Sequence, residues 1–279
     1  MNQLLLNGEY FPIEDQRLLS ATNRAFLYGD GIFETIKLQN KTILFWEDHF
    51  NRMMEGANAL ALDCSRLNKE TLKASIISLA ELNSLSTARI RIQLWRSPGG
   101  LFTPADNTVQ YLINATEFTS APALKRSCFF FEDVPLAYSS ISRYKTCNAL
   151  PYILASIKRK QLGADEMILF NTDGFVSECT SSNIFWLKGE TLCTPSLEMG
   201  CIEGIVRKQV LSFARQLHIK VLEGQFFKED LLDADFVFTT NTAGISQLAC
   251  IEGKVLREKH PLFDQLTEAF SLAIQQQQE

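Results

Sequence analysis

The stretch that most constrains the fold lies between residues 145 and 207, where short strand-like runs alternate with tight turns. Apolar residues over 167–170 are followed by the turn Asn171-Thr172-Asp173-Gly174, and a second such run covers 183–188. Beyond Gly204 the apolar residues recur at helical spacing. Strands joined by turns and followed by an amphipathic helix predict a mixed α/β domain.

Three residues in this stretch carry chemistry. Lys145 lies just before a helix expected over 150–161, where a loop can point inward. A lysine of ordinary pKa, roughly 10.4, attacks poorly as an amine, so a reactive lysine must be desolvated or lie near other cations. Glu178 follows a strand inside a sheet, and a buried carboxylate is costly unless it is paired. Gly204 opens a helix whose free N–H groups and dipole form an anion site.

A lysine for a Schiff base, a carboxylate for a ring nitrogen and a phosphate site are the parts that a pyridoxal phosphate site needs. Further motifs extend this pattern along the chain: Arg24-x-x-x-x-Gly-Asp-Gly31, His49-x-x-Arg52, Gly163-Ala164-Asp165-Glu166 and the run 178–207. Together they resemble the class IV aminotransferase family of pyridoxal phosphate enzymes. That family includes branched-chain aminotransferases, D-amino acid aminotransferases and aminodeoxychorismate lyases.

The resemblance implies an α/β (α+β) fold with two domains, a small N-terminal α/β domain and a larger, β-rich C-terminal pseudobarrel. Residues 117–124 are the best candidate linker, because they are small, polar and broken by proline. We therefore expect an N-terminal α/β domain at 1–121. The C-terminal domain at 122–279 is expected to bind the cofactor and to carry Lys145.

The first half contains clear local signals. Asn7-Gly8 between two apolar runs predicts a hairpin turn, because this pair accepts positive φ. Helices are expected over 47–61 and 69–82, with Asn68 as the cap of the second. The strand over 88–95 alternates apolar and polar residues, which predicts one buried face.

The resemblance also implies residue roles. Lys145 binds the cofactor as an internal aldimine, is displaced by the substrate amine, and then moves the proton at the substrate Cα. Arg52 grips the cofactor phosphate, since a guanidinium fork matches phosphate oxygens, and Glu178 pairs with the ring nitrogen. Asn183 is expected to be structural more than catalytic. The expected cofactor-binding set is Arg52, Lys145, Glu178, Asn183, Gly204, Ile205, Val206, Asn241 and Thr242; the expected substrate contacts are Phe33, Arg96 and Ala243.

Family members differ in the step after the proton is removed, and the sequence leaves alternatives open. Phe33 stands where D-specific enzymes carry a tyrosine, and the loop after Arg96 lacks their Arg-x-His, which disfavours that group. The pair Gly99-Gly100 favours an aminodeoxychorismate lyase, which releases pyruvate and 4-aminobenzoate for folate synthesis. Ala149 lacks the tyrosine common in branched-chain enzymes. We expect an aminotransferase acting on a small L-amino acid, with branched-chain ones among the candidates, and a 2-oxo acid; the lyase is the alternative and a non-catalytic cofactor-holding protein is a third.

Composition restricts the partners and the location. Asp and Glu outnumber Lys and Arg by 32 to 27 without a basic cluster, which argues against nucleic acid as a partner. The seven cysteines are scattered, no Cys-x-x-Cys occurs and only three histidines are present, so we expect no metal site and a cytoplasmic location. No apolar run approaches the ~18 residues of a membrane span, so no membrane partner is expected. The resemblance implies a homodimer.

Overall fold

The structure is a computed structural model that describes residues 2–15 and 18–278. The chain forms two compact units, the first built mainly from Met1–Thr119 and Tyr144–Asn148 and the second from Ser120–Arg143 and Ala149–Gln277. The first break therefore follows Thr119, close to the expected boundary after residue 121. Met1 and Glu279, the outer ends of the two expected domains, lie outside the described residues.

The lysine segment departs from the expectation. Lys145 was expected in the C-terminal domain, but Tyr144–Asn148 group with the first unit. The physical reason is backbone pairing: Thr146 bridges Ile32 in antiparallel fashion, at the beginning of a strand of the first unit. Composition shifts along the chain identify a linker, but they do not reveal a short segment that pairs back with an earlier strand.

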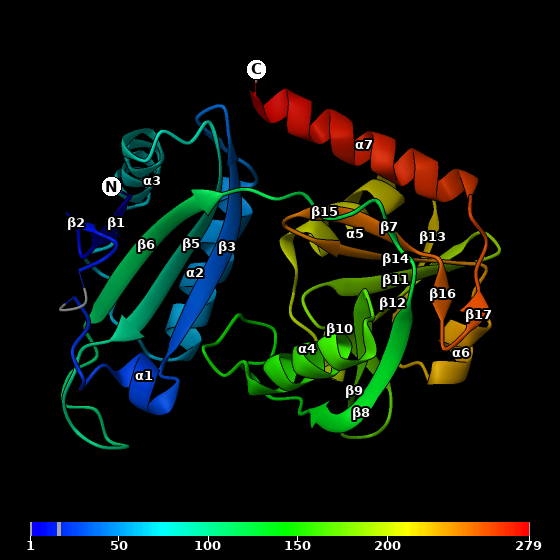
Figure 1. Ribbon diagram of the computed structural model, residues 1–279, viewed down its shortest axis with the longest axis horizontal. Helices are drawn as coiled ribbons and strands as arrows, with labels where there is room; N and C mark the ends of the chain where they lie inside the picture. Colours follow the sequence, from blue (N-terminus) through cyan, green and yellow to red (C-terminus); the bar gives the residue numbers. More distant parts are fainter. Residues whose placement is uncertain (1, 16–17, 279) are drawn as a thin grey trace. The chain divides into compact units, whose positions relative to one another are not determined.

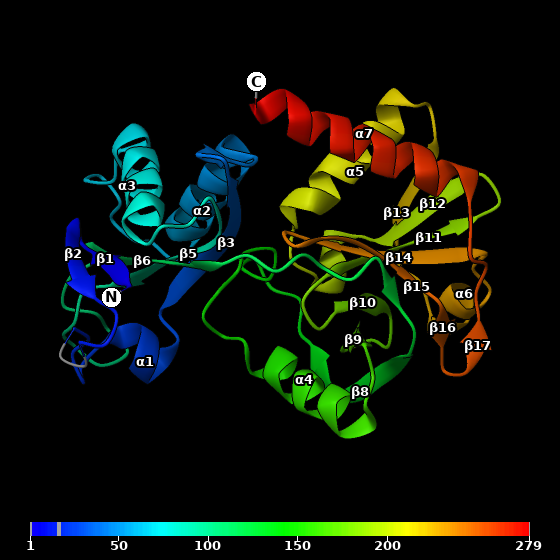
Figure 2. The same cartoon turned by 45° about the horizontal axis from the view of Figure 1, so that its top comes forward.

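The first unit is an antiparallel sheet with helices on one face. Its strands run in the order β2-β1-β6-β5-β3-β4, and α2 and α3 lie together over one face of this sheet (Figure 1, Figure 2). The elements are β1 (Gln3–Leu6), β2 (Glu9–Pro12), α1 (Arg24–Tyr28), β3 (Gly31–Gln39), β4 (Thr42–Ile43), α2 (Trp46–Ala59), α3 (Lys69–Leu82), β5 (Thr87–Arg96) and β6 (Val109–Glu117).

The local predictions for this unit are confirmed. β1 and β2 pair around Asn7 and Gly8, whose φ angles of +50° and +95° are the left-handed values that such a turn requires. The side chain of Asn68 accepts a hydrogen bond from Thr71 N and caps α3. Alternate residues of β5 are fully buried in the core between the sheet and the helices, namely Ala88, Ile90, Ile92 and Leu94.

The second unit contains two sheets, a five-stranded one in the order β10-β9-β8-β16-β17 and a six-stranded one in the order β13-β12-β11-β14-β15-β7. The strands are β7 (Leu124–Lys125), β8 (Cys128–Leu136), β9 (Glu166–Asn171), β10 (Val176–Cys179), β11 (Asn183–Lys188), β12 (Thr191–Pro195), β13 (Lys220–Gly224), β14 (Phe236–Asn241), β15 (Gly244–Leu248), β16 (Cys250–Ile251) and β17 (Lys254–Val255). The helices are α4 (Leu150–Leu162), the 3₁₀ turn Leu197–Met199, α5 (Ile205–Gln216), α6 (Lys228–Leu232) and α7 (Pro261–Gln278).

Helices cover the sheets of this unit on defined faces. Helices α5 and α7 lie on one side of the six-stranded sheet, and α4 lies by β8 and β9 (Figure 2). The contact with α7 is aromatic: Phe263 packs against Phe236 and Phe238, with ring centroids 4.7 and 5.1 Å apart. Among the helices that the structure describes, none combines the length and the apolar character needed to cross a membrane.

Candidate functional site

The backbone around Lys145 is held against the beginning of β3. Phe33 N–H donates to the Lys145 carbonyl at 2.8 Å, and Cys147 N–H donates to the Gly31 carbonyl at 2.8 Å. A Cβ on residue 31 would lie 2.4 Å from the Leu94 carbonyl oxygen, so only glycine allows this approach. The lysine thus occupies a short segment whose position depends on strand pairing in the first unit.

The side chain of Lys145 lies beside Phe33. Its Nζ is 4.9 Å from the centroid of the Phe33 ring, and the guanidinium carbon of Arg91 is 3.8 Å from the same centroid. Aromatic rings attract cations within about 6 Å of their centroids. Phe33, expected to contact the substrate, therefore lies next to the residue expected to be catalytic.

Arg52 lies on α2, where it forms a buried ion pair. Its Nε and Nη2 donate to the two carboxylate oxygens of Glu34 at 2.8 and 2.6 Å, and His49 Nδ1 lies 2.7 Å from Glu34 Oε2. Burial opposes ionisation of Glu34, but the charge of Arg52 and the hydrogen bond from His49 outweigh it and bring its pKa to about 2. Burial lowers the pKa of His49. His49 and Arg52, three residues apart on α2, thus both bind the Glu34 carboxylate on β3. The contact of Arg52 with the cofactor phosphate stays a prediction.

Arg96 uses all five of its N–H groups within the protein. Nε and Nη2 bind Asp30 at 2.9 and 3.2 Å, and Nη2 also donates to the Leu60 carbonyl at 2.6 Å. Nη1 donates to the Ala61 carbonyl at 3.2 Å and to Asn107 Oδ1. This arrangement favours a positioning role for Arg96, while its direct contact with a substrate stays a prediction.

Glu178 lies buried in β10 of the second unit and accepts three hydrogen bonds from neutral groups. Tyr152 Oη donates to Oε1 at 2.6 Å, Ile202 N–H donates to Oε1 at 3.1 Å, and Asn183 Nδ2 donates to Oε2 at 3.1 Å. Burial and the charge of Glu178 raise the pKa of Tyr152 well above its usual value, so the phenol stays a donor. The carboxylate is therefore held in a fixed orientation.

Asn183 connects Glu178 to the start of α5. Its Nδ2 also donates to the Ile202 carbonyl at 2.7 Å, and a Cβ on residue 204 would lie 2.0 Å from its Oδ1. Gly204 has a φ of −64°, which any residue tolerates. Glycine is thus required at 204 because of the Asn183 side chain and not because of the backbone angle, a reason that the sequence did not reveal.

The N-terminus of α5 is available to an anion. No side chain caps it, and the N–H groups of Ile205 and Val206 find no acceptor among the residues that the structure describes. The side chains of Ile205 and Val206 are buried, so only their backbones can serve a ligand. Unpaired N–H groups at a helix start suit a phosphate, and these residues therefore fit the phosphate of the expected cofactor.

The loop after β14 lies at the same end of the sheet. Asn183 pairs with Thr240 across β11 and β14, so Asn241, the last residue of β14, lies near Asn183. Asn241 Nδ2 donates to Ser181 O at 3.1 Å and Ser182 Oγ at 3.0 Å. The second unit therefore brings together Glu178, Asn183, the α5 start and the loop of Asn241, Thr242 and Ala243.

Within that loop, Asn241 has a folding role. Its Oδ1 accepts a hydrogen bond from Ala243 N–H at 2.8 Å, and the Ala243 carbonyl accepts one from Ala121 N–H at 2.9 Å. Asn241 thus organises the turn with both its Oδ1, which accepts, and its Nδ2, which donates. The contacts of Thr242 with the cofactor and of Ala243 with the substrate stay predictions.

Sequence reasoning missed two residues. Tyr152 gave no signal, because a tyrosine in the first turns of an amphipathic helix is typical of ordinary packing. Arg24 belongs to the Arg-x-x-x-x-Gly-Asp-Gly motif, but no role was assigned to it. In the structure it donates from Nε to Asp30 at 2.8 Å, so the buried arginine and the half-buried aspartate of that motif form an ion pair.

The chain is similar to known proteins over most of its length. The family model described as amino-transferase class IV matches residues 31–249. A Methanocaldococcus jannaschii protein, named provisionally as a branched-chain-amino-acid aminotransferase, is 29% identical over 262 residues, covering 92% of this chain and 90% of that protein. The aminodeoxychorismate lyase of Bacillus subtilis is 26% identical over 248 residues, covering 86% of this chain and 83% of the lyase.

A solved structure is also similar. The crystal structure of the Escherichia coli branched-chain amino acid aminotransferase superposes with a TM-score of 0.88 and 24% identity, over 97% of this chain and 93% of that one. At 24% identity, this structural similarity shows a shared fold and nothing more specific. The expected fold class is thereby confirmed.

Proposed function

The chain belongs to the class IV aminotransferase family, and on this premise we propose that it is a pyridoxal-phosphate-dependent aminotransferase. It exchanges the amino group between a small L-amino acid and a 2-oxo acid. The observation that carries this proposal is the buried Glu178 carboxylate, oriented by three neutral donors beside an uncapped helix start. An acid and an anion site in one arrangement suit a protonated pyridine ring that carries a phosphate.

Each candidate residue has a physical task in this proposal. Lys145 holds the cofactor covalently and moves the proton at the substrate Cα. Glu178 stabilises a protonated ring nitrogen, and the backbones of Gly204, Ile205 and Val206, together with Arg52 and Thr242, bind the phosphate. When bound, pyridoxal phosphate supplies an electron sink for the charge that develops at Cα.

Lys145 and Arg91 both lie against the Phe33 ring. Arg91 approaches the same Phe33 ring, so a second cation lies in the neighbourhood of the lysine. A second positive charge near a lysine favours its uncharged form, and Arg91 is the candidate for that charge here. Phe33 is accordingly proposed as a wall between this amine and the substrate side chain.

Branched-chain L-amino acids are the donors to test first. A relative with provisional branched-chain naming aligns over nearly the whole chain, and the Phe33-Glu34 pair suits that group. A lyase acting on aminodeoxychorismate is the second candidate, because a lyase of 26% identity covers most of the chain and the chain carries Gly99-Gly100. For Gly100 the glycine is required, since its φ is +71° and a Cβ would lie 2.1 Å from the Thr103 carbonyl.

The deciding experiment follows the absorbance of cofactor-loaded protein while single L- and D-amino acids are added without an oxo-acid acceptor. Conversion of the cofactor to its pyridoxamine form by an aliphatic L-amino acid would support the aminotransferase and identify its donor. Absence of conversion by every donor, with the loaded cofactor plainly visible, would reject it. Release of pyruvate from aminodeoxychorismate is then the assay for the lyase.

We also propose a cytoplasmic homodimer. All seven cysteines are free, which fits a reducing compartment. The dimer rests on the family resemblance, and light scattering of the loaded protein measures it directly.

A further inference from the structure

The motif at residues 163–166 ends in a buried acid that the proposed function does not use. Glu166 is the first residue of β9, and only 1% of it is exposed. Charged side chains are seldom buried to this extent unless they are paired. The partner is Lys125 at the end of β7, itself 7% exposed, whose Nζ donates to Glu166 Oε2 at 2.7 Å.

This ion pair connects the two sheets of the second unit. Lys125 Nζ also donates to Thr239 Oγ1 on β14 at 2.9 Å. Strands β7 and β14 belong to the six-stranded sheet, whereas β9 belongs to the five-stranded sheet. Replacement of a buried ion pair by apolar residues of similar volume is often neutral or stabilising. Stability alone is therefore a weak reason for the pair, and its other contacts indicate what it does.

The second oxygen of Glu166 reaches the turn that joins β10 to β11. Oε1 accepts hydrogen bonds from Met167 N–H at 3.1 Å and from Thr180 N–H at 3.2 Å. Thr180 N–H is shared with the Met167 carbonyl, which lies at 3.1 Å. Glu166 thus supplies one of two acceptors that hold the first residue of the 180–182 turn.

The same turn is held from the six-stranded sheet. Asn241 Nδ2 on β14 donates to the Ser181 carbonyl at 3.1 Å and to Ser182 Oγ at 3.0 Å. The turn therefore lies between an acid from one sheet and an amide from the other. Glu178 precedes this turn and Asn183 follows it, and their side chains hydrogen-bond at 3.1 Å. A displacement of the turn changes the orientation of both.

We propose that Glu166, held by Lys125, is a positioning residue that fixes the 180–182 turn and thereby orients Glu178 and Asn183. This inference rests on the proposed function, in which Glu178 stabilises the protonated ring nitrogen of the cofactor. Glu166 acts through the Thr180 N–H group and not by contact with cofactor or substrate. Lys125 supplies the compensating charge, without which a buried carboxylate is costly.

Two double variants separate this role from stability. Both carry Lys125→Met, so neither leaves an unpaired buried charge, and their melting temperatures should be similar. With Glu166→Gln an amide oxygen can still accept from Thr180 N–H, and pyridoxal phosphate should bind within about threefold of the wild-type affinity. With Glu166→Met the acceptor is lost, and the affinity should fall about tenfold, as expected for one hydrogen bond. Equilibrium dialysis measures both affinities.

Hydrogen exchange of the Thr180 amide is the second measurement, made on the protein without cofactor. Exchange should be about tenfold faster in the double variant with Glu166→Met than in the one with Glu166→Gln, because only the latter retains an acceptor at residue 166. Asp165→Asn is the matched control, since this neighbouring acid accepts from the N–H groups of residues 126 and 127. Its cofactor affinity and Thr180 exchange should equal those of the wild type.

Equal cofactor affinities in the two double variants, or equal exchange of Thr180, would overturn the proposal. If the variant with Glu166→Met does not fold, Glu166→Asp decides, because it keeps the charge for Lys125 but shortens the reach to Thr180. Wild-type affinity in Glu166→Asp would also refute the positioning role.

The amino-donor absorbance assay on the wild type reports the proposed aminotransferase separately. Normal donor conversion with equal affinities in the two double variants rejects only the positioning role of Glu166. No conversion by any donor, with the tenfold difference in affinity present, rejects only the aminotransferase. A protein that binds no pyridoxal phosphate rejects both.

Discussion

Lys145 and Phe33 are joined both through the backbone and through the side chains. Phe33 N–H donates to the Lys145 carbonyl at 2.8 Å, and Lys145 Nζ lies 4.9 Å from the Phe33 ring centroid. The lysine segment follows residues of the second unit in the chain, yet it pairs with β3 of the first. The position of the proposed catalytic amine therefore depends on a strand more than one hundred residues away in sequence.

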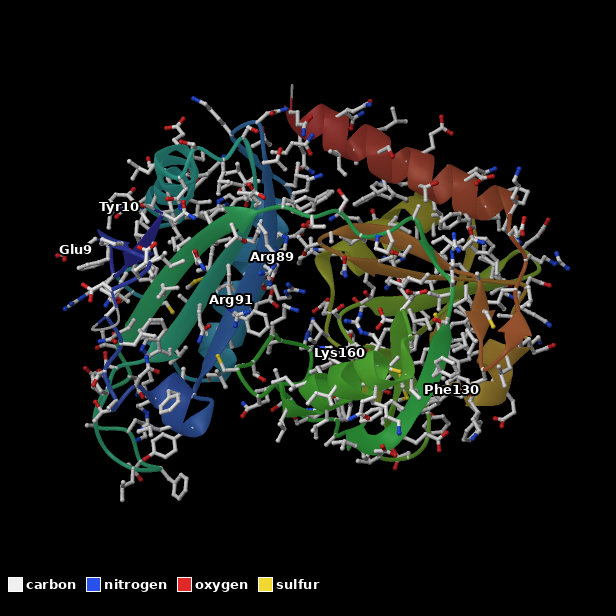
Figure 3. The ribbon with its side chains drawn as sticks, viewed as in Figure 1. Glu9, Tyr10, Arg89, Arg91, Phe130 and Lys160 are labelled. Atoms are coloured by element: carbon white, nitrogen blue, oxygen red, sulfur yellow. The ribbon has the colours of Figure 1, made fainter. Side chains whose placement is uncertain are left out.

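Lys145→Ala should abolish turnover, by at least about a thousandfold, because no other amine is proposed to move the proton at Cα. The fold should persist, since the contact with β3 uses the backbone of Lys145. Steady-state kinetics and thermal unfolding measure the two effects. Lys160→Ala on α4 is the control, because this lysine is exposed (Figure 3). Substantial activity in Lys145→Ala would contradict the assignment.

Glu178→Gln should weaken cofactor retention and lower turnover by about a hundredfold or more, because the ring nitrogen would lose its anionic partner. It should also destabilise the protein by about 1–3 kcal/mol, since both carboxylate oxygens accept hydrogen bonds and the new NH₂ would face a donor. Tyr152→Phe, which removes one donor, should cost about 1 kcal/mol. Cofactor dialysis and thermal unfolding test these expectations, with exposed Glu190→Gln as control. A variant that retained cofactor like the wild type would argue against the ring-nitrogen role.

Gly204→Ala should destabilise the protein by about 1–3 kcal/mol and weaken cofactor binding, because the new Cβ would lie 2.0 Å from Asn183 Oδ1. Gly224→Ala should be nearly neutral, since its Cβ would meet Phe226 at an ordinary 3.5 Å. In an Asn183→Ala background the cost of Gly204→Ala should shrink, because the clashing amide is gone. An equal cost in both backgrounds would show that the clash is not the cause.

Arg52→Ala should lower both stability and cofactor affinity. Removal of the guanidinium leaves the buried Glu34 carboxylate without its ionic partner, which costs about 3–5 kcal/mol in such pairs. The double variant Glu34→Ala with Arg52→Ala should recover part of the stability without recovering cofactor affinity. Parallel recovery of both would mean that Arg52 acts on the cofactor only through the fold.

His49 should make stability depend on pH below about 6.5. Burial lowers its pKa in the folded protein, so the unfolded chain binds more protons as pH falls through the usual value of 6.5. Stability should therefore drop on acidification, at most by about 1.4 kcal/mol per pH unit. Glu34 causes a further loss of stability only at lower pH, between its usual pKa of 4.5 and its pKa of about 2 in the folded protein.

The measurement is the melting temperature of wild type and His49→Gln from pH 7.5 to 5. The amount by which the melting temperature of the wild type exceeds that of His49→Gln should decrease steadily as the pH falls. His218→Asn is the matched control, because His218 is exposed and its φ of +56° suits asparagine. A constant difference between wild type and His49→Gln would contradict a buried, neutral His49.

Much of the fold could be predicted because local chemistry decides it. The alternation of β5, the Asn7-Gly8 turn and the Asn68 cap each depend on neighbours a few residues away. The motif positions of Glu178 and Gly204 also indicated an acid and an anion site, and the structure places them together in one unit.

Long-range contacts decided the rest. The requirement for glycine at 204 comes from an asparagine on strand β11. The N–H groups of Arg96 donate to two carbonyls, an amide oxygen and Asp30. No spacing in the sequence carries that information, because the partners are separated by loops of arbitrary length.

The sequence by itself determined the family, the strand and helix pattern, and the types of groups that the site contains, since these depend on residue identity and local periodicity. Only the tertiary structure decided which donors are free and which are used. It assigned Lys145 to the strand that holds it and directed the N–H groups of Arg96 to acceptors within the protein. The partners of each donor and acceptor are residues that lie close in space, so they are determined only by the folded chain.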